Sequence, residues 1–268
     1  MVLHLTTMLR STVILLFSIS AAAFCTAYFD CPPQNSARIS DAAAARSPVL
    51  VELFTSEGCS DCPPADKLLA DLDHDGSLDG IPVIALAEHV DYWDGQGWHD
   101  RFSSHAFTER QERVVSRLRL SSAYTPQMVV DGRLEFVGND SNALHRVVNQ
   151  AAQTPKTADV KLSWKDDGTL NVAVTDSTSH AATVLLAITE SDLTTKVGGG
   201  ENGGRELHHS AVVRRLAELG KLKDRNFAST TKIQRDSHWN PQRLKAVVFV
   251  QELHTGAVLG AQSIRFPG

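Results

Sequence analysis

Residues 49–64 read VLVELFTSEGCSDCPP, in which an apolar run is followed by a glycine and two closely spaced cysteines. The run Val49–Phe54 is typical of a mostly buried strand. Gly58 permits a sharp exit from that strand, and leucines at helical spacing follow over Ala65–Leu72. The stretch therefore predicts a strand, a tight turn that carries Cys59–Cys62, and a helix that begins beside the cysteines.

A cysteine pair at the junction of a strand and a helix favours redox chemistry. The unpaired N–H groups and the dipole at the helix start favour the thiolate form of Cys59, and Cys62 lies on the same turn. We expect Cys59, on the loop side of the junction, to be exposed and to attack a disulfide, and Cys62, which lies deeper, to resolve the mixed disulfide that forms. Asp61 should oppose the thiolate and raise the pKa of Cys59, or simply cap the helix. The alternatives are half of a zinc site or two inert side chains.

The N-terminal part of the chain is expected to lie outside the fold. Arg10 precedes an apolar run of about 14 residues, Ser11–Phe24, which is shorter than the roughly 18 needed to span a bilayer. We expect a secretory signal over residues 1–27 and a disordered tether over residues 28–47, with an uncleaved membrane anchor as the alternative. The mature chain would be periplasmic or extracellular and would have no membrane span.

The remaining length suits two domains, because a chain of 268 residues can bury two ordinary cores. Thr154–Thr157 is typical of a linker, and it divides an expected domain over residues 48–154 from one over residues 157–268. The formal net charge is -5 and the pI is about 6.1. This balance gives no reason to expect nucleic acid as a partner.

A second buried strand, Ile81–Ala87, follows the first helix. A strand–helix–strand succession predicts parallel pairing, and the carboxyl ends of parallel strands share one edge of a sheet. We therefore expect His89 and Asp91 on the same edge as the cysteines. His89 is a candidate proton carrier or third metal ligand, although such a histidine is more often hydrogen-bonded structure. A polar helix is predicted over residues 103–120.

A hairpin is predicted over Ser121–Gly138, with its turn at Asp131-Gly132 and with Thr125-Pro126 ahead of its first strand. A helix that ends near Gln150 closes the unit. This order of elements, together with the cysteine motif, resembles the thioredoxin fold, which implies a mixed central sheet flanked by helices. The resemblance also implies that Pro126 is the cis-proline found beside the dithiol in that fold.

Three stretches are more specific: Glu52–Cys59 with Cys62–Asp66, His89–Asp94 and Tyr124–Val130. They resemble the secreted thioredoxin-like family catalogued as domain of unknown function 1223, and this resemblance implies the fold and export but no substrate. The Trp-Cys-Gly-Pro-Cys pattern of thioredoxin is replaced here by Gly-Cys-Ser-Asp-Cys. The reduction potential and the partner of thioredoxin therefore cannot be carried over.

Beyond the linker the pattern changes to period-two alternation, which predicts a mainly antiparallel, sandwich-like β module. The expected strands lie over residues 160–164, 170–174, 183–189, 246–252 and 257–264. One inserted helix is predicted over Ser210–Leu219, with Gly220 as its C-cap.

Gly198–Gly203 formally matches the glycine pattern of a dinucleotide site. Glu201 would repel a pyrophosphate and the next predicted helix starts too late, so we reject that interpretation. A flexible loop, with Arg205, His208 and His209 after it, is the better interpretation. The loop could still close over the dithiol or over a partner.

The leading hypothesis is an exported thiol–disulfide oxidoreductase that acts on a protein or small-molecule thiol or disulfide and needs no cofactor. Thr125 and Pro126 would shape its substrate groove. The first alternative is a protein that handles copper(I) or another metal through the cysteine pair and His89, because soft thiolates suit copper(I). The second is a redox-inert scaffold with a fixed structural disulfide. A clip between Cys31 and Cys59 would also exclude redox chemistry.

Overall fold

The computed structural model describes residues 47–267, which fall within a single compact unit. The expected signal over residues 1–27 and nearly all of the expected tether, with Cys31, lie outside the described residues. None of the helices between residues 47 and 267 combines the length and the apolar character that a bilayer crossing requires.

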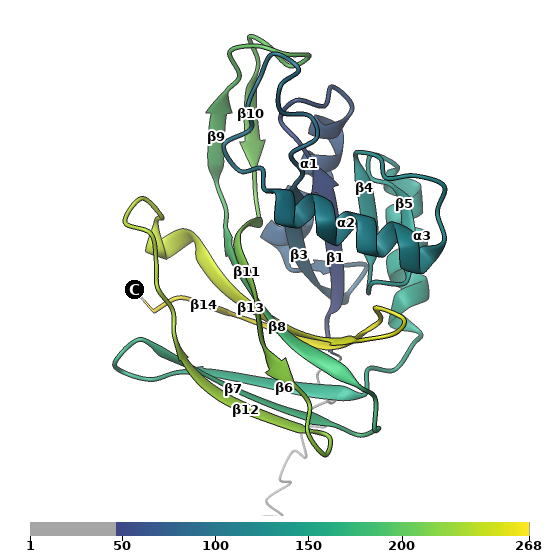
Figure 1. Cartoon of the computed structure of the whole chain (residues 1–268), viewed down its shortest axis with the longest axis vertical. Coiled ribbons are helices and arrows are strands. Elements are labelled where there is room, and N and C mark those ends of the chain that lie inside the picture. The colour runs from purple at the N-terminus through teal and green to yellow at the C-terminus, as the bar shows by residue number, and fades with distance from the viewer. Residues whose placement is uncertain (1–46, 268) are drawn as a thin grey trace, which may run out of the picture. The chain divides into compact units, whose positions relative to one another are not determined.

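The first half of the described chain alternates strands with helices, as the sequence predicts (Figure 1). Its elements are β1 (Val49–Thr55), α1 (Cys62–Asp75), β2 (Ser77–Leu78), β3 (Ile81–His89), α2 (His105–Leu118), β4 (Gln127–Val130), β5 (Leu134–Val137) and α3 (Ser141–Ala152). β1 and β3 are parallel neighbours, and β4 and β5 extend the sheet in antiparallel pairing. α1 has prolines in its first turn and ends at Gly76, which adopts the left-handed conformation (φ 64°) that glycine tolerates best.

The second half of the described chain is built of strands. They are β6 (Ala158–Trp164), β7 (Thr169–Asp176), β8 (Ala182–Glu190), β9 (Leu193–Lys196), β10 (Glu206–His209), β11 (Val212–Lys221), β12 (Asn226–Lys232), β13 (Leu244–Glu252) and β14 (Val258–Arg265). A short 3₁₀ helix over Pro241–Arg243 precedes β13. β12, β7 and β6 form a three-stranded sheet, and β9 and β10 form a two-stranded ribbon.

One nine-stranded mixed sheet runs through both halves, in the order β14-β13-β8-β11-β3-β1-β4-β5, with β2 paired to β3 beside this path. β11 makes the link, because its Val212 pairs in parallel with Ala87 of β3 while the strand pairs antiparallel with β8. The amide of Ala87 also donates to the Ala211 carbonyl, at 2.8 Å. The boundary expected at residues 154–157 therefore lies between two parts of one sheet and not between two separate sheets.

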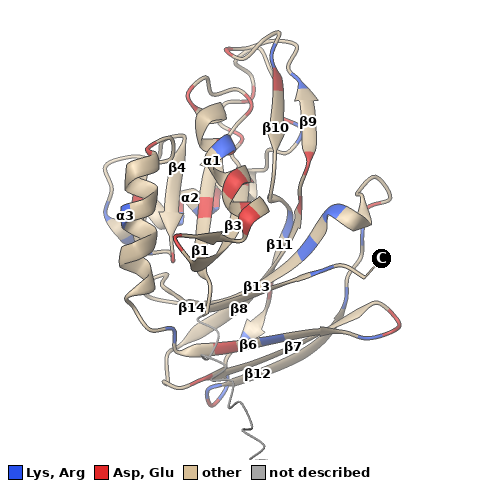
Figure 2. Ribbon diagram, turned by 180° about the vertical axis from the view of Figure 1, so that it is seen from behind, with Lys and Arg blue, Asp and Glu red and all other residues tan. Residues whose placement is uncertain are grey.

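A salt bridge adds to the connection between the two halves. Lys245 Nζ, on β13, lies 2.6 Å from Asp73 Oδ1, near the end of α1. Figure 2 shows acidic positions along α1 and basic positions at the start of β13. Both side chains are mostly shielded from solvent, so this pair is screened less than a surface pair would be.

The structure corrects one predicted element, because residues 210–219 do not form a helix. They belong largely to β11, which shows register shifts against β8 between Val213 and Arg215 and between Glu218 and Gly220. Each shift inserts a residue and interrupts the period-two alternation, which leaves apolar residues at a helix-like spacing. The strands that pair with β11 are remote in sequence, so the local pattern could not reveal them.

Both faces of the sheet are covered (Figure 1). The odd-numbered apolar residues of β1 pack with Leu69 of α1 and Val147 of α3. On the opposite face, Leu50 of β1 packs with Phe107 of α2. The three-stranded sheet packs on β8 and β13 through a separate apolar cluster, which makes the C-terminal part sandwich-like.

The face of β1 that meets α2 also carries Glu52, which is fully buried. Arg110 of α2 donates from Nε to Glu52 Oε1 at 2.8 Å, and the same nitrogen lies 3.1 Å from Glu88 Oε1. Burial raises the pKa of Glu88 to about 8, against the attraction of Arg110. Arg110 therefore compensates two carboxyl groups buried on neighbouring strands.

Candidate functional site

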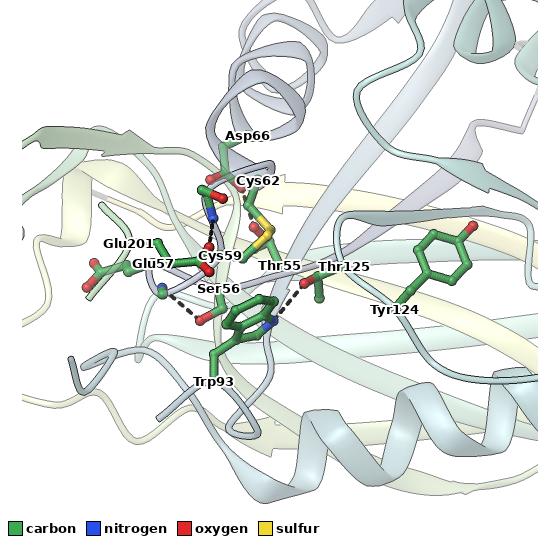
Figure 3. The surroundings of a disulfide bond; sticks show 12 residues. Thr55, Ser56, Glu57, Cys59, Cys62, Asp66, Trp93, Tyr124, Thr125 and Glu201 are labelled. Carbon is green, nitrogen blue, oxygen red and sulfur yellow. Dashed lines mark hydrogen bonds between the residues drawn. A yellow bond between two sulfur atoms is a disulfide. The ribbon is translucent and has the colours of Figure 1, made fainter. Parts of the chain in front are cut away.

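The two cysteines form a disulfide at the junction of β1 and α1 (Figure 3). Cys62 is the first residue of α1, and its α-carbon lies 5.4 Å from that of Cys59. The amide of Cys59 donates to the Ser56 carbonyl and that of Cys62 to the Cys59 carbonyl, each at 3.2 Å. Because Cys59 is bonded to Cys62, it does not form the clip with Cys31 that the sequence left open.

The disulfide is covered, which differs from the expected exposure of Cys59. The exposed fraction is 1% for Cys59 and 0% for Cys62. Asn202, itself fully buried, donates from Nδ2 to the carbonyls of Glu57 and Cys59, both at 2.9 Å. The amide of Ser60 donates to Glu201 Oε2 at 3.0 Å. The glycine-rich loop, which the sequence suggests could close over the dithiol or over a partner, lies against the backbone of the cysteine turn in this structure.

Glycines allow this covering loop, defined here as Gly198–Gly204, to meet the loop that follows β3. A Cβ on Gly199 would lie 2.3 Å from the Gly97 carbonyl oxygen, and Gly200 has a positive φ of 65°. Arg205 Nη1 donates to Asn202 Oδ1 at 2.7 Å and orients the amide that covers the disulfide. The glycine pattern therefore serves close backbone packing and not phosphate binding.

Trp93 and Thr125 form another wall of the site (Figure 3). Trp93 Nε1 donates to Thr125 Oγ1 at 2.8 Å. The Thr125–Pro126 peptide bond is cis, as the resemblance to thioredoxin implies. A Cβ on Gly138 would lie 3.2 Å from both Pro126 Cβ and Ala65 Cβ, so the proline lies close to the first turn of α1.

A buried cluster of ionisable groups lies on the carboxyl side of β1 and β3. His89 Nδ1 lies 2.6 Å from Asp100 Oδ2, and that oxygen also accepts from the amide of Glu57 at 2.9 Å. Burial opposes the ionisation of Asp100, but the charge and hydrogen bond of His89 lower its pKa to about 2. Burial likewise disfavours the charged form of His89, yet Asp100, Asp66 and Glu57 together raise its pKa.

His209, the last residue of β10, joins the same cluster. Its Nε2 lies 3.3 Å from Glu57 Oε1, its Nδ1 lies 4.0 Å from Asp66 Oδ2, and its ring centre is 5.1 Å from that of His89. Thr55 Oγ1 donates to Asp66 Oδ1 at 2.8 Å. Burial raises the pKa of Asp66, against the attraction of His209 and His89. Asp66 is therefore biased toward its neutral form one helical turn after Cys62.

The cluster leaves several polar atoms free. Glu57 Oε1, His89 Nε2 and both ring nitrogens of His209 are buried without a hydrogen-bond partner in the described part of the chain. Over the same residues, no group of three or more His, Cys, Asp and Glu side chains has the spacing of a metal site. This arrangement can store and pass protons next to the disulfide.

The predicted support residues lie in different surroundings. His89 belongs to the buried cluster, and Thr125 and Pro126 flank the disulfide. Asp61 occupies the N-cap position of α1 but makes no side-chain capping hydrogen bond. Asp91 accepts from Thr108 Oγ1 at 2.6 Å and so ties the loop after β3 to α2.

Sequence reasoning missed Glu57, Asp66, Asp100 and Asn202. Only Asp66 carried a signal, because it is a charged residue on the apolar face of the predicted helix, between Ala65 and Leu69. The other three reach the site through loops, and loops carry no periodic signal.

Comparison with known proteins places the chain in a family without an assigned activity. The family described as "Protein of unknown function (DUF1223)" matches residues 50–251. The crystal structure of protein AGR_C_4864 from Agrobacterium tumefaciens is similar, with a TM-score of 0.66 and 25% identity, over 82% of this chain and 94% of that chain. A domain of the outer membrane lipoprotein Omp28 from Porphyromonas gingivalis gives a TM-score of 0.24 at 16% identity, over 41% of this chain and 93% of that chain.

The TM-score of the Porphyromonas domain is too low to support an inference, and no curated protein matches the chain. The family match, in contrast, spans nearly the whole sheet and includes the disulfide, the cis-proline and the covering loop. The chain therefore belongs to the DUF1223 family.

Proposed function

We propose that this chain is an exported thiol–disulfide oxidoreductase whose redox-active pair is Cys59 and Cys62. The observation that carries the proposal is the Cys59–Cys62 disulfide at the first turn of α1, backed by buried ionisable groups. A helix start favours the thiolate, and buried ionisable groups near it are typical of functional sites. The thioredoxin-like order of elements supports the proposal by analogy, and the apolar run at the N-terminus supports export.

The exchange can be written from the oxidised form present in the structure. A substrate thiolate attacks Cys59 Sγ, the bond between Cys59 and Cys62 breaks, and its electron pair leaves on Cys62 Sγ. A second substrate thiolate attacks the substrate sulfur of the mixed disulfide, and Cys59 leaves as a thiolate. The substrate gains a disulfide, the two cysteines become thiols, and the two substrate protons pass to them. The reverse sequence reduces a substrate disulfide.

Asp66 is the residue best placed to handle the proton of Cys62. It lies one turn along the same helix, and burial raises its pKa, so its neutral carboxyl group is a proton source (Figure 3). His209 and Glu57 connect Asp66 to the rest of the buried cluster. Asp66 would protonate the Cys62 thiolate as the disulfide opens and recover the proton when the disulfide closes.

The covering loop limits which substrates reach the disulfide. Asn202 and Glu201 hold the loop against the backbone of Cys59 and Ser60, and both cysteines are buried. We therefore expect a protein substrate to reach Cys59 only after Gly198–Gly204 moves away. Opening of the loop would then be a step of the reaction, as it is for other enzymes with closing loops.

The test is an insulin-reduction assay on the mature chain, with dithiothreitol as the electron donor. We expect the wild type to accelerate reduction. Cys62→Ser should accumulate a mixed disulfide at Cys59, and Cys59→Ser should accumulate none. A wild-type disulfide that dithiothreitol does not open, together with no insulin reduction, would overturn the proposal and leave a redox-inert scaffold. Alkylation and mass mapping report the state of each cysteine.

Copper(I) handling is the second candidate, because soft thiolates suit copper(I) and His89 Nε2 is buried without a hydrogen-bond partner in the described residues. It is the weaker candidate, because no three His, Cys, Asp or Glu side chains in those residues have the spacing of a metal site. The reduced protein can be titrated with copper(I) in competition with bicinchoninate. Copper handling predicts tight binding that is lost in Cys59→Ser and weakened in His89→Gln. If copper binds no more tightly than to Cys59→Ser, this alternative is wrong.

A further inference from the structure

A hollow lies between the start of α2 and β11, and none of its lining residues belongs to the cysteine motif. Its volume is about 540 Å³, which is within the range of small-molecule sites. In Figure 1, α2 begins beside β11 and then crosses in front of β3 and β1. The hollow therefore lies where the helix layer ends and the sheet face continues.

The irregular strand β11 brings two successive arginines to this hollow. In a regular strand, Arg214 and Arg215 would point to opposite faces of the sheet. The register shift against β8 between Val213 and Arg215 interrupts that alternation, and both arginines line the hollow. Arg101 and Arg113 line it from the side of α2. Strand irregularities that re-aim side chains are frequent beside binding sites.

Arg214 is half-buried and donates no side-chain hydrogen bond within the described residues, although the charges of Glu190 and Asp236 act on it. Its guanidinium carbon lies 5.1 Å from the Phe102 ring centre and 5.5 Å from the Trp239 ring centre. The nearest carboxylate oxygen, of Glu190, is 3.6 Å away, too far for a hydrogen bond. Arg101 lies over the same Phe102 ring, at 4.6 Å. Arg101 Nη2 also donates to the Thr194 carbonyl at 2.9 Å. Two guanidinium groups therefore contact one ring at the edge of the hollow and give this edge a positive charge.

The groups around the hollow only partly occupy these arginines. Arg215 Nη1 donates to the Gln234 carbonyl at 3.2 Å and leaves its other donors without a hydrogen bond in the described residues. Arg110 also lines the hollow, but Glu52 and Glu88 already hold it. Arg113 has only Glu109 nearby, at 3.8 Å. The acidic side chains that line the hollow are Glu218 and Asp236, and Asp236 Oδ1 accepts from the amide of His238 at 2.9 Å.

Apolar side chains form the remaining walls of the hollow. Leu185, Val213 and Leu216 come from the sheet, Phe107 comes from α2, and the ring of Trp239 closes one side. An apolar wall next to guanidinium groups suits a ligand with an apolar body and a carboxylate, because arginine can bind a carboxylate through two parallel hydrogen bonds.

We propose that this hollow is a binding site for a small organic carboxylate with an apolar or aromatic body. Arg214 and Arg215 bind the carboxylate, and the apolar wall with Trp239 receives the body of the ligand. The proposal does not depend on redox activity, since none of its residues belongs to the cysteine motif or to the covering loop.

The test is calorimetric titration of the full mature chain with 2-naphthoate, its neutral analogue 2-naphthamide, and acetate. We expect one site for 2-naphthoate and at least about tenfold weaker binding of the other two. Arg214→Gln and Arg215→Gln should each weaken 2-naphthoate about tenfold, and Glu218→Gln should tighten it by removing a carboxylate from the wall. Quenching of Trp fluorescence that disappears in Trp239→Phe would locate the ligand.

Arg146→Gln is the matched control, because it removes one exposed arginine from α3, outside the hollow. It should leave the affinity for 2-naphthoate unchanged. Arg215 is exposed, so its variant keeps the test valid if Arg214→Gln fails to fold. Equal binding of 2-naphthamide, an equal loss in Arg146→Gln, or no 2-naphthoate binding by folded wild type would each overturn the proposal.

Discussion

Asp66 links the stability of the protein to pH. It is buried on α1, and its folded-state pKa lies above the ordinary value of 3.8. A raised pKa means that its contribution to stability is fully present below pH 3.8 and is lost as pH rises through the folded-state pKa. At neutral pH the folded protein therefore holds a carboxyl group that resists ionisation.

Asp66→Asn should raise the free energy of unfolding at pH 7, because asparagine has nearly the same shape and cannot ionise. The gain should shrink as pH falls through the folded-state pKa and should be lost well below pH 3.8, where Asp66 is neutral in both states. Urea unfolding across this pH range measures the effect. Asp71→Asn, at an exposed position of the same helix, should change little. Equal changes in the free energy of unfolding of the two variants would contradict the conclusion that ionisation of buried Asp66 costs stability.

If Asp66 also supplies the proton of Cys62, insulin reduction should slow in Asp66→Asn but not in Asp71→Asn.

Arg110 pairs with two buried carboxyl groups, those of Glu52 and Glu88. Arg110→Met should destabilise the protein by roughly 3 to 5 kcal/mol, because it leaves Glu52 and Glu88 buried without compensation. Part of the loss should return at acidic pH, where both carboxyl groups are neutral. Chemical denaturation at neutral and acidic pH measures the free energy of unfolding of the variant. Arg113→Met, one turn further along α2 and exposed, should cost less than about 1 kcal/mol. A small loss of stability in Arg110→Met would show that Glu52 and Glu88 do not depend on the charge of Arg110.

At the scale of elements, we expect the covering loop Gly198–Gly204 to control access to the disulfide. Asn202→Ala removes two hydrogen bonds, each worth about 0.5 to 1.5 kcal/mol, from the closed position. Reduction of the Cys59–Cys62 bond by dithiothreitol should become about tenfold faster if opening of the loop limits it. A time course of alkylated thiols measures the rate. Asn149→Ala, on the exposed side of α3, should match the wild type. Unchanged kinetics in folded Asn202→Ala would mean that the loop does not control access.

At the scale of the whole molecule, the continuous sheet joins the two halves. A fragment that ends at Thr154 would expose the β3 edge that pairs with β11 and would uncover the apolar residues Leu50, Ile84 and Leu86. We expect this fragment to aggregate or to lack cooperative unfolding. The intact chain nicked at residues 154–157 should elute as one species in size-exclusion chromatography. A dispersed NMR spectrum from the fragment would contradict this expectation.

Local patterns in the sequence predict much of the fold. The apolar run of β1, the cysteine motif and the helix after it are each encoded within a few residues. Turn residues such as Asp131-Gly132 and period-two alternation identify the hairpin and most strands of the C-terminal half. The cis bond at Pro126 came from family resemblance and not from spacing. The sequence did not predict the strand β11, because its two register shifts leave apolar residues at a spacing typical of a helix.

The sequence by itself predicted the parallel pair β1 and β3 and placed two cysteines at the start of α1, because these features depend on patterns within single short segments. It left open whether Cys59 bonds to Cys62 or to Cys31, and the structure bonds it to Cys62. Only the tertiary structure decided that Cys59 is covered, that His209 meets Glu57 and Asp66, and that β11 joins the two halves. Asn202 lies 143 positions from Cys59 along the chain, and no local pattern specifies such a contact. It forms only when the packed sheet brings remote loops to the same edge.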